Sequence, residues 1–158
     1  MLDRIGVWHK AFPNSIVCWG NHDDRPNRLA KSVNIPAEIY LKQYNELWDT
    51  KTWQWVEDYE IDGVKYFHGD GYSGKYAYAN ASQKEAMSVV IGHCHSVAGI
   101  HWNANNQKLW FGMSVGSGID DKTYAFEYGK RCPRKSIISC GVVINGHPYH
   151  EMMPLGVD

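Results

Sequence analysis

Hydrophobic positions along this chain change their spacing from one segment to the next, and each spacing predicts a kind of element. Residues 2–10 carry apolar side chains at helical spacing, and a short apolar run at 15–19 predicts a buried strand. A further helix is expected over 25–34, where Pro26 suits the first turn, and another over 36–48. We interpret the aromatic stripe on this last helix as core packing.

The middle of the chain predicts a hairpin, a helix and a further strand. Residues 53–60 and 64–67 have the pattern of strands joined by Asp62-Gly63, a strong two-residue turn. This hairpin is expected to carry a histidine at its tip. A helix over 75–87 and a buried strand at 88–91 follow.

The last third predicts antiparallel strands. Residues 99–102 and 108–113 flank a polar turn, and residues 137–144 and 147–153 flank Asn145-Gly146, the strongest hairpin signal in the chain. We find no internal repeat and no linker in the sequence. Helices interleaved with strands early, and hairpins late, predict an α/β fold with a mixed sheet.

Composition bounds the functions that are possible. A chain of 158 residues with 44% hydrophobic content can form one domain with its own core, and we expect a single domain. A net charge of -1 gives no general attraction to nucleic acid or anionic membrane, and no apolar run approaches the ~18 residues of a membrane span. The four dispersed cysteines are typical of reduced thiols, which favours a cytoplasmic protein.

Polar groups that can bind a metal ion follow three of the predicted strands. Asn21 and His22 follow the first strand, and His68 follows the strand at 64–67. His93 and His95 follow the strand at 88–91. Neighbouring glycines allow close approach, and imidazole nitrogens with an amide oxygen suit manganese, iron, nickel, cobalt or zinc. The pattern predicts a divalent metal site at the carboxyl ends of strands. The remaining histidines are interpreted as surface or hydrogen-bonded residues: His9, His101, His147 and His150.

Three glycine-flanked strings occur in a fixed order: Gly20-Asn21-His22-Asp23, His68-Gly69 and Gly92-His93-Cys94-His95. They resemble signatures of the calcineurin-like metallophosphoesterases, and Ser114-Val115-Gly116-Ser117 is similar to the small-residue loop that follows them in that family. The resemblance spans about residues 1–120. It implies a β-sandwich of two mixed sheets flanked by helices, with a binuclear metal centre at the strand ends.

The resemblance also implies a role for each residue. The metal ligands would be Asn21, His68 and His93 for one ion and His95 for the other. His22 would stabilise the phosphoryl oxygens or protonate the leaving group, and Asp23 would orient the His22 ring. The implied reaction is hydrolysis of a phosphomonoester or phosphodiester by metal-activated water.

Two further motifs of the family are absent ahead of Gly20. Its Asp-x-His and Gly-Asp-x-x-Asp strings would come first, but the nineteen residues before Gly20 contain neither. We expect an N-terminal truncation on the order of 40 residues, since one βαβ unit takes about 30 or more. One metal position then keeps three protein ligands and the other keeps only His95, so we expect one ion per chain. The sheet edge exposed by the missing strands predicts a homodimer or larger assembly.

Three functions remain open from the sequence. The first is a metal-dependent phosphoesterase, impaired or dependent on a partner for the absent half of its site. The second is an inactive remnant or scaffold with a vestigial one-metal site. A nucleic-acid-binding module is a third, because seven tryptophans and ten tyrosines could stack on bases, although the charge does not support it. Retention of all five candidate groups favours the enzyme, and Asp70 could replace a lost ligand. The substrate class is left open among nucleic acids, nucleotides, phosphoproteins and small phosphoesters.

Overall fold

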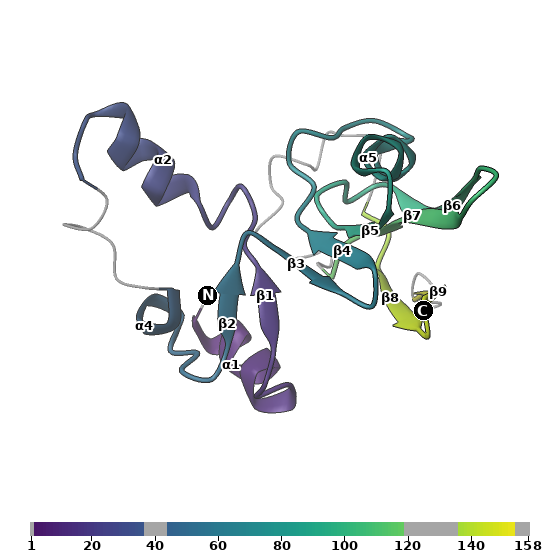
Figure 1. Cartoon of the computed structure of the whole chain (residues 1–158). Coiled ribbons are helices and arrows are strands. Elements are labelled where there is room, and N and C mark those ends of the chain that lie inside the picture. Colours follow the sequence, from purple (N-terminus) through teal and green to yellow (C-terminus); the bar gives the residue numbers. More distant parts are fainter. Residues whose placement is uncertain (1, 37–43, 119–135, 154–158) are drawn as a thin grey trace. The chain divides into compact units, whose positions relative to one another are not determined.

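The computed structural model describes residues 2–36, 44–118 and 136–153 (Figure 1). The chain divides into two compact units, residues 1–59 and residues 60–158. Both contain helices and strands, which confirms the α/β class. A single domain, a two-sheet sandwich and an N-terminal truncation stay predictions. No helix in the described ranges is both long enough and apolar enough to cross a membrane.

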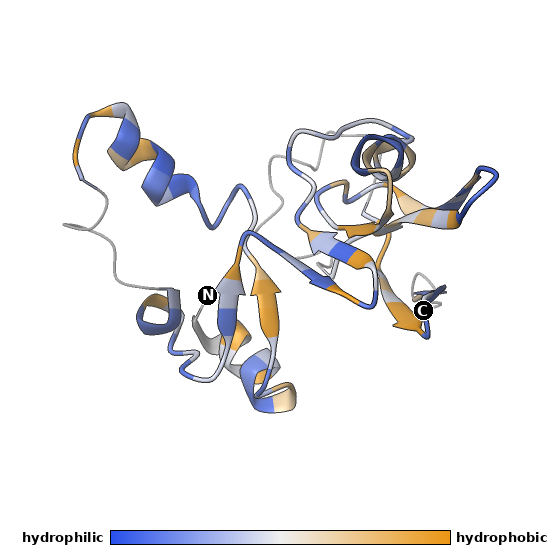
Figure 2. Cartoon of the chain, in the orientation of Figure 1, coloured by the Kyte–Doolittle hydropathy of each residue, from blue (hydrophilic) through white to orange (hydrophobic). Residues whose placement is uncertain are grey.

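The first unit is built around a pair of parallel strands. Its elements are α1 (Leu2–Ala11), β1 (Ile16–Cys18), α2 (Arg25–Ser32), α4 (Tyr44–Trp48) and β2 (Gln54–Val56). Strands β1 and β2 run parallel with their residues paired in order. Figure 2 shows that β1 is hydrophobic along its length, whereas α2 is largely hydrophilic. The helices expected at 2–10 and 25–34 are confirmed. The strand expected at 15–19 is confirmed as a strand, but its expected burial is wrong, since Ile16 is 41% exposed and Val17 and Cys18 are half-buried.

The helix expected over 36–48 is confirmed only at its end. Helix α4 covers Tyr44–Trp48, and residues 37–43 lie outside the described ranges. Of the aromatic stripe on this helix, Tyr44 and Trp48 are half-buried and Leu47 is exposed. The interpretation as core packing is therefore wrong for Leu47.

The second unit contains most of a five-stranded mixed sheet. Its strands are β3 (Asp58–Ile61), β4 (Val64–Phe67), β5 (Ser88–Ile91), β6 (Ala98–Ala104) and β7 (Leu109–Val115), in the spatial order β3-β4-β5-β7-β6. Strand β5 lies between β4 and β7 and is parallel to both, whereas β6 is antiparallel to β7. The carboxyl ends of β4, β5 and β7 consequently lie side by side at the same end of the sheet.

The two faces of this sheet are covered by different elements. Helix α5 (Ala77–Glu85) packs on β5, β6 and β7 through buried alanines, beside Val89 and Ile91. The hairpin β8 (Ser139–Ile144) and β9 (His147–Met152) contacts β7 on the side of Val90, Phe111 and Met113. The second unit therefore has three layers, with the sheet between a helix and a hairpin.

Both short hairpin turns expected from the sequence are confirmed. Asp62 and Gly63, with φ of 53° and 71°, join β3 to β4, and Asn145 and Gly146, with φ of 50° and 74°, join β8 to β9. Two residues with positive φ are what a tight hairpin turn requires. The strands expected at 99–102 and 108–113 are likewise confirmed as the antiparallel pair β6 and β7.

Two details of the expected strands are wrong. Residues 53–60 form two strands, because β2 pairs with β1 while β3 pairs with β4. The tip of the hairpin is Asp62-Gly63, so the histidine lies instead at the open end of β4, where β4 meets β5. The small-residue loop expected from Ser114 to Ser117 begins later, since β7 continues to Val115 and Ser114 pairs with Gly99.

One ion pair joins the sheet to α5. Lys65 Nζ lies 3.0 Å from Glu85 Oε2, and Tyr72 Oη donates to Glu85 Oε1 at 3.2 Å. The hydrogen bond from Lys65 is the main reason that the pKa of Glu85 is lowered, which outweighs the opposing effect of burial. A lowered carboxyl pKa stabilises the fold above the ordinary carboxyl pKa, and this stabilisation is lost as the pH falls through the folded value.

We expect Glu85→Gln to lower the free energy of unfolding at neutral pH by about 1 kcal/mol. The difference from wild type should shrink at acidic pH, once the pH has fallen through the lowered pKa of Glu85 and the carboxyl group is protonated in both states. Urea unfolding at both pH values measures this. Glu151→Gln, at an exposed position of β9, is the control and should change little. Equal destabilisation by Glu85→Gln at both pH values would show that the Glu85 charge is irrelevant.

Candidate functional site

The best-defined part of the candidate site is formed where β4 and β5 end side by side. The two strands are parallel, with Phe67 paired to Ile91 in the last described register position. His68 follows β4, and the Gly92 N–H donates to the His68 carbonyl at 3.1 Å, which extends the pairing by one step. The residues after these two strands are therefore placed next to each other by the main chain.

His68 and His93 are brought into contact at the carboxyl ends of these two strands. Nδ1 of His93 and Nε2 of His68 lie 3.1 Å apart in a hydrogen bond. The ring centroids are 5.0 Å apart, with an angle of 78° between the planes, so one ring nitrogen points at the other. Both side chains are half-buried. One nitrogen must carry the proton and the other must accept it.

Two backbone conformations hold this pair in place. Gly69 has φ of 98°, and a Cβ there would lie 3.0 Å from Cβ of Ile91, so the turn after His68 requires glycine. His93 itself has φ of 47°, a left-handed conformation that is unusual for a residue with a side chain. Unfavourable conformations of this kind persist only where surrounding contacts impose them, and they are common at functional sites.

The His68 and His93 ring nitrogens are close enough to be considered as a pair of metal ligands. Imidazole nitrogens bind zinc at about 2.1 Å in tetrahedral sites, so two such ligands of one ion are about 3.4 Å apart. The observed separation is 3.1 Å, but the nitrogens face each other in a hydrogen bond, so the rings would have to turn before both lone pairs could point at one ion. Binding would also require both nitrogens to be unprotonated.

His95 and Cys94 occupy the turn that follows His93. The Val97 N–H donates to the Cys94 carbonyl at 3.0 Å, and the His95 carbonyl accepts from Ile137 N–H at 2.8 Å. The Cys94 thiol is directed to the Tyr72 carbonyl, with Sγ at 3.8 Å, and burial raises the pKa of this thiol. Cys94 is therefore a protonated thiol at neutral pH and belongs to the apolar cluster beneath the turn.

The small-residue loop after β7 lies at the same end of the sheet as the turns after β4 and β5. The Ser117 N–H donates to the Ile137 carbonyl at 2.8 Å, and Ser139 Oγ donates to the Val115 carbonyl at 2.7 Å. A Cβ on Gly116 would lie 2.6 Å from Ser139 Oγ, so this approach also requires glycine. Segment 137–139 thus supports the turns after both β5 and β7, a role that the sequence interpretation missed because no local pattern signals it.

The other candidate residues belong to the first unit and follow β1, as expected. The Asp23 carboxylate accepts from the Gly20 N–H at 2.8 Å, and the Asp24 N–H donates to the Gly20 carbonyl at 3.0 Å. The Arg28 guanidinium donates to the Asn21 carbonyl. Asn21 and Asp23 are half-buried, and His22 is exposed. The orientation of the His22 ring by Asp23 stays a prediction, since the described contact of that carboxylate is with Gly20.

The complete ligand set expected from the sequence is not assembled within either unit. Over residues 2–36, 44–118 and 136–153, no group of three or more His, Cys, Asp or Glu side chains is positioned to hold a metal ion. Asp70, considered as a substitute ligand, is exposed. The ligands that the structure brings together are the pair His68 and His93.

Other expected assignments of histidines agree with the structure. His9 Nε2 is hydrogen-bonded to Thr52 Oγ1 at 2.9 Å, and His150 Nε2 to Ser139 Oγ at 3.1 Å. His101 and His147 are exposed. These histidines have structural or surface positions, as predicted.

Comparison with known proteins adds no assignment. No protein-family model matches the chain, and no curated protein matches it either. The likeness to metallophosphoesterases is therefore carried by the motifs and their placement at strand ends.

Proposed function

We propose that this chain is a metal-dependent phosphoesterase in which His68 and His93 bind the metal ion. The observation that carries this proposal is the 3.1 Å separation of the two ring nitrogens at the ends of adjacent parallel strands. Ligands in open α/β sheets bind beyond the carboxyl ends of the strands, so the pair lies where a substrate is expected. Asn21 and His95 stay proposed further metal ligands, as the resemblance to metallophosphoesterases implies.

The roles proposed for the remaining groups follow from their chemistry. A bound divalent ion would supply a Lewis acid and lower the pKa of a water molecule. His22 is exposed in a turn, where it can approach a phosphoryl oxygen or give a proton to the leaving alcohol. Asp23 fixes the turn through the Gly20 N–H, and this bond limits the movement of the His22 main chain.

The proposal includes an assembly of more than one chain. Within the described residues β1 pairs only with β2, so one edge of β1 is open. Trp8, Phe12 and Ile16 of the same unit are 58%, 57% and 41% exposed. An open strand beside exposed apolar side chains favours pairing with a second copy.

Metal content and hydrolysis, measured on one preparation, test the proposal. Protein loaded with Mn²⁺ should hold about one ion per chain by elemental analysis and should hydrolyse a generic aryl phosphodiester slowly, with chelator abolishing the activity. Sedimentation of the same sample should give a dimer or larger species. One ion without turnover would leave the scaffold as the better description. Absence of metal under every loading condition would exclude both the enzyme and the one-metal scaffold.

A further inference from the structure

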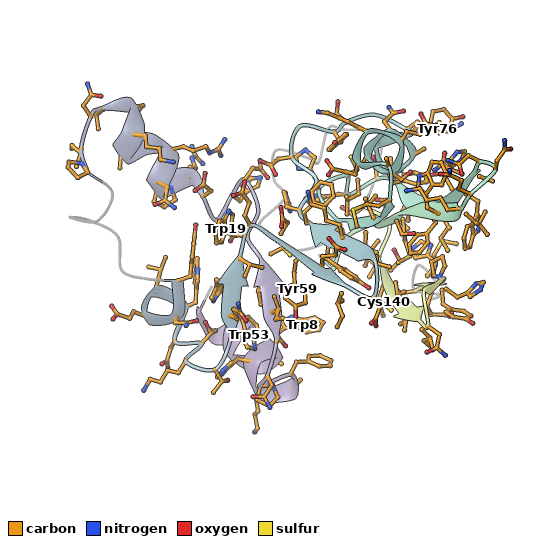
Figure 3. All side chains as sticks on the ribbon, in the orientation of Figure 1. Trp8, Trp19, Trp53, Tyr59, Tyr76 and Cys140 are labelled. Atoms are coloured by element: carbon orange, nitrogen blue, oxygen red, sulfur yellow. The ribbon has the colours of Figure 1, made fainter. Side chains whose placement is uncertain are left out.

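The first unit contains a cavity that the proposed function does not use. Its volume is about 420 Å³, and its lining consists of Tyr44, Asn45, Trp53, Gln54 and Trp55. Figure 3 marks Trp53 on this unit. Small-molecule sites are typically about 300–1,000 Å³, mostly apolar, with a few polar groups. This pocket is open to solvent, with three aromatic rings supplying the apolar part of its lining and two amides the polar part, and none of these described lining residues is charged.

The two indole rings are held in fixed orientations. Trp53 Nε1–H donates to the Phe12 carbonyl at 2.7 Å, and Trp55 Nε1–H donates to Thr50 Oγ1 at 3.1 Å. Thr50 is fully buried, so its hydroxyl is a rigid partner. Both indole N–H groups are already bonded, and Tyr44 stacks on Trp55, so the parts of the two indoles that line the pocket offer apolar ring surface to a ligand. Surfaces that are fixed before binding lose little entropy when a ligand stacks on them.

The amides supply the polar groups of the cavity. Asn45 Oδ1 accepts from Thr50 Oγ1 at 3.4 Å, a bond that does not use the amide NH₂ group. The Gln54 N–H donates to the Ser15 carbonyl at 2.9 Å, which holds its main chain, while its side chain is exposed. An amide presents a donor and an acceptor in one plane, which is the pattern that pairs with the edge of a nucleobase.

Tyr44 connects this cavity to the turn that carries His22. Its ring stacks on Trp55 at 5.2 Å and 25° and on Trp19, the residue before Gly20, at 5.6 Å and 23°. The Tyr44 hydroxyl accepts from Asn27 Nδ2, at 3.2 Å.

The same turn affects Tyr44 electrostatically. Asn27 Nδ2 also donates to Asp24 Oδ1 at 2.9 Å, so Asn27 bridges the phenol and the turn. Burial, and then the charges of Asp24 and Asp23, raise the pKa of Tyr44. The cavity and the turn at residues 20–24 are therefore parts of one packed and hydrogen-bonded cluster.

We propose that the cavity binds the nucleobase of a nucleoside phosphate ester. A base stacks on the fixed indoles and pairs with the amides, and its uncharged surface suits the described lining residues, none of which is charged. The phosphate lies outside the cavity, toward the turn with His22; this part alone rests on the proposed function. A net charge of -1 for the whole chain favours a small ligand over a long polyanion.

Binding of adenosine, which has no phosphate, to metal-free protein tests the cavity. Isothermal titration of wild type should detect binding, and Trp53→Ala should weaken it about 10-fold or more. Leu29→Ala is the control, because Leu29 of α2 lies in the same unit, is 66% exposed and is not among the described residues that line the cavity. Ribose alone should not bind.

The outcomes separate the cavity from the proposed enzyme. Adenosine binding without any hydrolysis would retain the cavity and reject the phosphoesterase, and hydrolysis without adenosine binding would do the reverse. Unchanged affinity for adenosine in a folded Trp53→Ala variant would overturn the proposal that the cavity binds a nucleobase. If near-UV circular dichroism shows that Trp53→Ala does not fold, Gln54→Ala at an exposed position should weaken binding several-fold, and unchanged affinity there would overturn it equally.

Discussion

Alanine in place of both His68 and His93 is expected to remove metal binding by this chain. The two ring nitrogens, 3.1 Å apart, are the ligands that the structure brings together, and loss of both leaves no imidazole pair at the ends of β4 and β5. Each single variant should weaken metal affinity by more than about 10–100-fold, since even loss of an outer-shell partner has that effect. Equilibrium dialysis against Mn²⁺ and Zn²⁺, followed by elemental analysis, measures the loss.

The controls for this experiment separate lost ligands from lost structure. His101→Ala removes an exposed histidine from β6 and should leave metal content unchanged. His93→Gly removes the ring and also relieves the left-handed conformation at φ of 47°, so it should be metal-free and at least as stable as His93→Ala. Metal content equal to wild type in the double variant would eliminate this pair as the site.

Gly112→Ala is expected to be the most destabilising small substitution in the second unit. A Cβ at this position of β7 would overlap the main-chain carbonyl of Tyr78, with the carbonyl carbon at 2.7 Å, and would lie 2.9 Å from Ser82 Oγ. Helix α5 would have to move off the sheet, because backbone atoms cannot rotate away as a side chain can. We expect a loss of about 3 kcal/mol or more in the free energy of unfolding, measured with urea.

Gly118→Ala is the matched control for this prediction. Among the described residues, no atom lies within 4 Å of a Cβ built at Gly118, and its φ is not in the left-handed region. Its stability should stay within about 0.5 kcal/mol of wild type. Similar stability of Gly112→Ala and Gly118→Ala would mean that α5 does not pack against β7 as closely as described.

Local signals predicted the elements of this chain well where they required a specific conformation. Asn145-Gly146 and Asp62-Gly63 form the expected turns because few residue pairs accept positive φ at both positions. The strand at 88–91 matches β5 residue for residue, since an apolar run closed by glycine has few other solutions. Such signals act between neighbouring residues, so the sequence alone can carry them.

Strand partners were predicted less well, because pairing joins residues that are far apart in the chain. Residues 53–60 have one alternating pattern, but β2 pairs with β1 and β3 with β4. The turn at Asp62-Gly63 was found, yet His68 was assigned to the wrong end of the hairpin. No periodicity in the sequence indicates that β4 pairs with β5 on the side opposite to β3.

The sequence by itself determined the candidate residues, their order and their position after apolar strands. Only the tertiary structure decided which of them meet. His68 and His93 come into contact because α5 returns the chain so that β5 lies parallel to β4, with the histidines after paired strand ends. Segment 137–139 supports the neighbouring turns through main-chain bonds, and Gly112 allows α5 to approach the sheet. These contacts depend on packing between distant segments, which residue type and spacing do not encode locally.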